Sequence, residues 1–63
     1  MQLNNIEKKV LEMIIAGQGN MYIADEIGYS ESTVKRIVKR LFNYFKVFKR
    51  VELVREAMKK MPV

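Results

Sequence analysis

Apolar residues recur at intervals of three and four along most of this sequence, and no other feature constrains the fold as strongly. Ile6, Val10, Met13 and Ile14 show the spacing, which places them in one stripe along an α-helix. No stretch alternates apolar and polar residues for long enough to predict a strand. The single proline, Pro62, stands next to the C-terminus and leaves the helical pattern intact. The sequence therefore predicts an all-α fold.

Helix start and stop signals divide the pattern into four segments. Asn4 followed by Glu7 is a capping-box pattern, and Gly17 can take the left-handed conformation that ends a helix. Asn20 and Ser30 are the expected N-caps of the second and third helices. We expect one compact four-helix domain over residues 1–63, with helices at residues 5–16, 21–27, 31–46 and 51–60.

Composition limits how such a chain can be stabilised and where it can work. The 63 residues include no Cys and no His, so disulfides are impossible and the usual zinc frameworks are excluded. We expect no cofactor, and stability must come from helix packing or from oligomerisation. No apolar run approaches the ~20 residues that span a bilayer, and the first residues lack the pattern of a signal peptide. We expect a cytoplasmic protein with no membrane partner.

The segment from residue 20 to residue 39 has the anatomy of a helix-turn-helix. Ala24 is small enough for the two helices to approach closely, and Gly28 tolerates the positive φ that the turn requires. Tyr29 can cover the turn. The residues expected to lock the two helices together are Ile23, Ile27, Val34 and Ile37.

Charge is separated cleanly around the third predicted helix. The chain carries a net charge of +5 with a pI of about 9.8, which is typical of a nucleic-acid-binding domain. At about 100° per residue, its cations and one amide gather on one face without any Asp or Glu, and the apolar residues gather on the other. Such a helix fits the major groove, where these side chains can reach base edges. The predicted base-contacting residues are Lys35, Arg36, Lys39, Arg40 and Asn43.

A second group of polar residues is placed to contact the DNA backbone. The N-terminus of the third helix can hold a phosphate, and its hydroxyl side chains can donate hydrogen bonds there. The predicted backbone-contacting residues are Asn20, Ser32, Thr33, Lys46 and Lys49.

These residues resemble a known family. The pattern over Leu3 to about Met58 is similar to the LuxR/NarL/GerE-type helix-turn-helix domain, and its most specific part runs from Ile23-Ala24 through Ser30 to Thr33-Val34-Lys35. The resemblance implies a fold of the winged-helix-like type without a wing. It also implies a sequence-specific transcriptional regulator of double-stranded DNA, associated with the nucleoid, and a homodimer formed by the last helix. The expected dimer-interface residues are Leu53, Val54, Ala57 and Met58.

The same surfaces allow other functional interpretations. The basic face could bind an acidic partner, so a small protein-binding module acting on RNA polymerase or a sigma factor is the alternative function. A membrane-surface bundle is a third reading. Phe42, Phe45 and Phe48 could stack on single-stranded nucleic acid, but their helical spacing opposite a basic face favours the core. With scattered carboxylates and no phosphate-binding Gly-rich loop, we expect neither an enzyme nor a small-molecule ligand within this chain.

Overall fold

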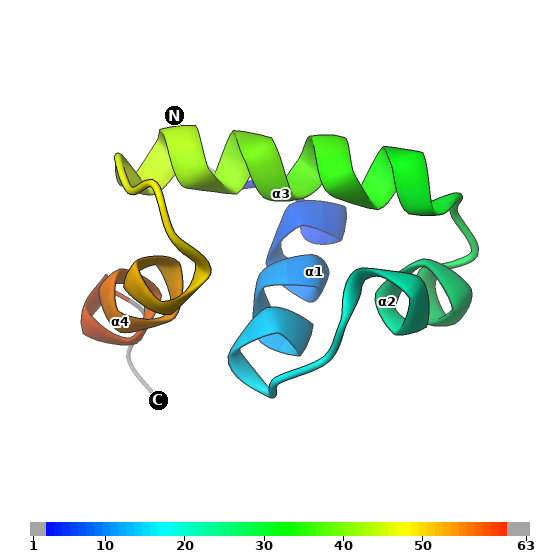
Figure 1. Cartoon of the computed structure of the whole chain (residues 1–63), viewed down its shortest axis with the longest axis horizontal. Helices are drawn as coiled ribbons and strands as arrows, with labels where there is room; N and C mark the ends of the chain where they lie inside the picture. The colour runs from blue at the N-terminus through cyan, green and yellow to red at the C-terminus, as the bar shows by residue number, and fades with distance from the viewer. Residues whose placement is uncertain (1–2, 61–63) are drawn as a thin grey trace.

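The computed structural model describes residues 3–60, and within that range it contains four helices and no strand (Figure 1). The all-α, four-helix prediction is confirmed, and every observed helix end lies within one residue of its predicted position. No helix within the described range combines the length and the apolar character needed to cross a membrane. The helices are α1 (Asn5–Ile15), α2 (Asn20–Ile27), α3 (Glu31–Phe45) and α4 (Arg50–Lys60).

Helix α3 is the centre of the arrangement. It lies across the top of the molecule in Figure 1, with α1, α2 and α4 all beneath it, and it packs against each of them. Every helix contributes to the single core between them, because each presents one apolar stripe inward. The buried residues are Val10, Leu11 and Ile14 from α1, Ile23 and Ala24 from α2, Val34, Ile37, Val38, Leu41 and Phe45 from α3, and Leu53 and Ala57 from α4.

Side-chain caps start two of the helices as predicted. The Asn4 Oδ1 accepts a hydrogen bond from the Glu7 backbone N–H at 2.7 Å, and Glu7 Oε1 accepts one from the Asn4 N–H at 3.0 Å. Ser30 Oγ accepts from the Thr33 N–H at 3.1 Å at the start of α3. The predicted cap of α2 is wrong, because Gly19 occupies that position and Asn20 is the first helical residue.

Left-handed residues end the helices, and one of them was not anticipated. Gly17 and Gly28 have φ angles of +88° and +75°, as the turns require. Lys46 also takes this conformation, with φ at +57°, although the sequence predicted that it would remain helical. The chain therefore leaves α3 before Phe48, whose exposed fraction is 90%. Phe45 is buried as expected, but the prediction that Phe48 belongs to the core is wrong.

A carboxylate secures the start of α4. Lys49 stands immediately before α4 and offers no capping oxygen in its side chain. Glu52 compensates from within the first turn, because its Oε1 accepts from the backbone N–H groups of Phe48 at 3.1 Å and Lys49 at 3.2 Å. These bonds satisfy donors that a helix start leaves free.

Candidate nucleic-acid interface

Helices α2 and α3 form a compact two-helix unit around a tight turn. Ala24 is buried where the helices meet, and the Tyr29 N–H donates to the Ala24 carbonyl at 3.0 Å across the turn. Gly28 supplies the left-handed residue between them. Ile23 and Val34 are completely buried and join the two helices to the core. This unit fixes the orientation of α3 relative to the rest of the domain.

The outward face of α3 carries the predicted base-contacting residues, and all five are exposed. At about 100° per residue, Arg36, Lys39 and Asn43 lie opposite the buried side of the helix. Lys35 lies toward one edge and Arg40 toward the other. We call this surface the α3 ridge: Lys35, Arg36, Lys39, Arg40 and Asn43. Because α1, α2 and α4 all pack beneath α3 (Figure 1), no helix within the described range covers the ridge.

The charge of the ridge is largely uncompensated. Within residues 3–60, no ion pair involves Lys35, Arg36 or Lys39. The N-terminus of α3 also contributes the positive end of the helix dipole, at the end of the ridge where Lys35 and Arg36 lie. A positively charged helix with one uncovered side fits the width of a DNA major groove and complements the negative charge of DNA.

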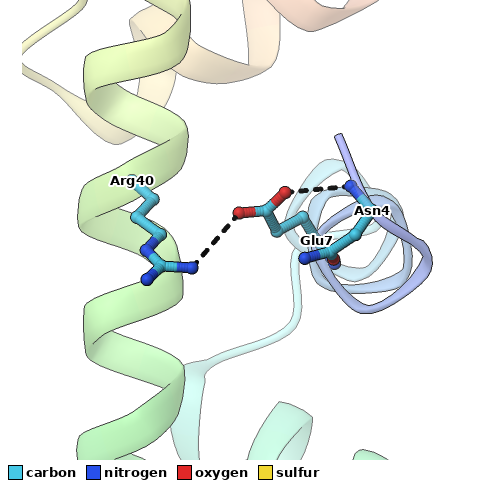
Figure 2. A network of polar contacts seen from close by, with 3 residues as sticks. All are labelled: Asn4, Glu7 and Arg40. Carbon is cyan, nitrogen blue, oxygen red and sulfur yellow. Dashed lines mark hydrogen bonds and ion pairs between the residues drawn. The ribbon is translucent and has the colours of Figure 1, made fainter. Parts of the chain in front are cut away.

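Arg40 is the exception, because a carboxylate of α1 reaches it (Figure 2). Its Nη1 lies 3.8 Å from Glu7 Oε2, while Glu7 Oε1 accepts the hydrogen bond from the Asn4 N–H. The Glu7 side chain is only 13% exposed and that of Arg40 is 71% exposed. One carboxylate therefore connects the N-cap of α1 to the edge of the α3 ridge.

The predicted backbone-contacting residues do not have equal freedom. Ser32, Lys46 and Lys49 are exposed, whereas Thr33 and Asn20 are half-buried. The Thr33 hydroxyl lies 2.9 Å from Ser30 Oγ, so it takes part in the cap of α3. The amide oxygen of Asn20 accepts from Arg50, which leaves its amide N–H groups for other partners.

Arg50 ties the last helix to the helix-turn-helix unit. Its Nη1 donates to Asn20 Oδ1 at 3.1 Å and its Nη2 donates to the Gln18 carbonyl at 2.9 Å. The fork of a guanidinium suits two acceptors at once. Neither the contacts of Arg50 nor the Glu7–Arg40 pair was predicted from the sequence. The partners are about 30 residues apart in each case, so local spacing carried no signal for them.

The predicted dimer-interface residues on α4 lie partly in the core and partly on the surface. Leu53 and Ala57 have no exposed surface, because they fill the core between α4 and the neighbouring helices. The prediction must be corrected at these two positions, since neither can reach a second copy in this fold. Val54 is half-buried and Met58 is 56% exposed. With the exposed Val51, these two form a helical stripe at i, i+3 and i+7, which we call the α4 stripe.

A tight helical pair that presents a free basic helix defines the class of helix-turn-helix DNA-binding domains. Residues 1–57 match the GerE family, described as bacterial regulatory proteins of the luxR family, and the chain belongs to that family. It is a LuxR-type domain of a DNA-binding transcription regulator. No curated protein and no solved structure matches the chain.

Proposed function

We propose that this domain recognises a specific sequence in double-stranded DNA by inserting α3 into the major groove. The observation that carries the proposal is the α3 ridge, which is exposed along its length and free of carboxylates between its cations. DNA phosphates attract such a surface whatever the DNA sequence is. The side chains opposite the buried side of α3, which form the crest of the ridge, then discriminate between bases.

Positions on the ridge suggest different roles for its residues. Arg36, Lys39 and Asn43 occupy the crest, where Arg and Lys can pair with guanine O6 and N7 and Asn can pair with adenine. Lys35 and Arg40, at the edges, were also predicted to read bases. The hydroxyls and cations around the ridge, with the start of α2, are placed for phosphates: Asn20, Ser32, Thr33, Lys46 and Lys49.

We further propose that two copies pair through the α4 stripe of Val51, Val54 and Met58. An isologous two-fold contact between helices requires apolar side chains at helical spacing, and here Val51 and Met58 are exposed while Val54 is half-buried. Arg50 would then link the dimer contact on α4 to the start of α2, because it bonds to Gln18 and Asn20. A dimer would read two half-sites related by its own symmetry, in the cytoplasm and on the nucleoid.

Selection of bound sequences from a random duplex pool tests recognition and pairing together. We expect an enriched site made of two related half-sites, and affinity that falls steeply with salt. Lys39→Ala should weaken discrimination at one base pair by about 1–3 kcal/mol. Lys9→Ala removes the same charge from an exposed position on α1 and should leave base preference unchanged.

The outcome can also contradict the proposal. Absence of duplex binding at low salt would refute DNA recognition. Capture of RNA polymerase by a chain that ignores duplex DNA would favour the protein-binding module instead. Enrichment of a single unpaired half-site would refute the dimer and leave recognition by α3 intact.

A further inference from the structure

The Glu7–Arg40 pair gives one cation of the α3 ridge a carboxylate partner. Arg40 lies at the edge of the ridge that faces α1, and Glu7 reaches it there with Oε2 at 3.8 Å (Figure 2). No ion pair within residues 3–60 restricts Arg36 or Lys39 in this way. Among the described residues, the ridge therefore contains two kinds of cation, of which one kind has a carboxylate partner.

Glu7 is itself well placed to hold a partner. Its side chain is 13% exposed, and Oε1 is fixed by the N–H of Asn4 at 3.0 Å. The Asn4 side chain returns a bond to the Glu7 N–H at 2.7 Å, so the capping box sets the carboxylate's position from both sides. The second oxygen is then presented to α3 by the rigid start of α1.

We infer that Glu7 is a positioning residue that increases the sequence discrimination of the domain by holding Arg40 at the α1 edge of the ridge. This inference rests on the proposed recognition of DNA by α3. In the target complex, Arg40 is already placed for its contact at the edge of the groove, so little freedom is lost on binding. In other registers the same arginine, kept beside Glu7, is not free to move to the nearest phosphate. Glu7 therefore penalises non-target DNA more than the target.

The variant Glu7→Gln separates this role from helix capping. Glutamine serves at this position of a capping box as glutamate does, so the start of α1 is retained. Only the charge that holds Arg40 is lost. Glu12→Gln is the matched control, because Glu12 is exposed on the same helix, carries the same charge and makes no ion pair within residues 3–60.

Binding is measured with the duplex recovered by selection and with a scrambled duplex of equal length, over a range of salt concentrations. For Glu7→Gln we expect scrambled-duplex affinity at 0.1 M salt to rise about fivefold to tenfold, with a salt slope steeper by about 0.9, because one more cation neutralises a phosphate. Target affinity should rise less, so discrimination falls. Glu12→Gln should change neither the slope nor the discrimination.

Removing Arg40 distinguishes positioning from a general effect of charge. Discrimination by Arg40→Gln and by Glu7→Gln/Arg40→Gln should be equal, because Glu7 acts through Arg40. The inference is overturned if Glu7→Gln matches Glu12→Gln, or if its effect persists without Arg40. If the wild-type chain binds neither duplex, the proposed function has failed instead.

A measurement on the unmodified chain tests the same point without a variant. In DNA-free protein, side-chain NMR of the arginines should show slower rotation of the Arg40 guanidinium than of the Arg36 guanidinium, which has no ion pair in the described range. Equal rotation rates would overturn the inference, because Glu7 would then exert no hold on Arg40.

Discussion

Replacing Leu53 with alanine tests whether the inner side of α4 belongs to the core of a single chain. Leu53 has no exposed surface and packs where α4 meets α1 and α3. Truncation to alanine removes three carbons, which is about 2.4 kcal/mol of transfer free energy at roughly 0.8 kcal/mol each. The cavity that remains adds a further cost, so we expect the free energy of unfolding to fall by about 3 kcal/mol.

That loss is large for a chain of this length. At roughly 0.05–0.15 kcal/mol per residue, 63 residues supply only about 3–9 kcal/mol in total. A domain of this size loses about 4–8 °C of Tm per kcal/mol, so Leu53→Ala should melt at least 12 °C lower. Circular dichroism melts at several protein concentrations measure this shift and separate it from dissociation of a dimer.

Met58→Ala is the matched variant on the outer side of α4. Met58 is 56% exposed, so its truncation should change the stability of the monomer by no more than about 0.5 kcal/mol. It should instead weaken the dependence of Tm on protein concentration, because it removes part of the α4 stripe. The reasoning would be refuted if Leu53→Ala cost under 1 kcal/mol at low concentration, or if both variants changed only the concentration dependence.

Three further predictions concern single backbone and cap positions. Gly28→Ala should lower the free energy of unfolding in urea by about 1–2 kcal/mol, because φ is +75° but the added Cβ meets no atom within 4 Å; a larger loss would reveal a steric conflict. Lys46→Gly should raise Tm by a few degrees by relieving the left-handed strain, and should flatten the salt slope of DNA binding by about 0.9; an unchanged slope would exclude a phosphate contact from Lys46. Asn4→Ala should cost about 1 kcal/mol of stability, measured by the same urea titration, and a neutral result would show that the cap bond contributes nothing.

Local signals in the sequence were enough for the helices and for the exposed side of α3. Periodicity, the capping box of Asn4 and Glu7, and the glycines at residues 17 and 28 act within a few residues, so they can be recognised without knowledge of the fold. The separation of cations from apolar residues around α3 is local in the same sense. It predicted correctly that Arg36 and Lys39 would be exposed.

What the tertiary structure decided depends on partners far away along the chain. Leu53 and Val54 are both apolar and adjacent, yet only the packing of α4 against α1 and α3 buries one completely and leaves the other half-exposed. The ion pair of Glu7 with Arg40 and the bonds of Arg50 to Gln18 and Asn20 likewise need the helices assembled. Local periodicity specifies which side of a helix is apolar, whereas only the packed helices determine how much of that side remains for a partner.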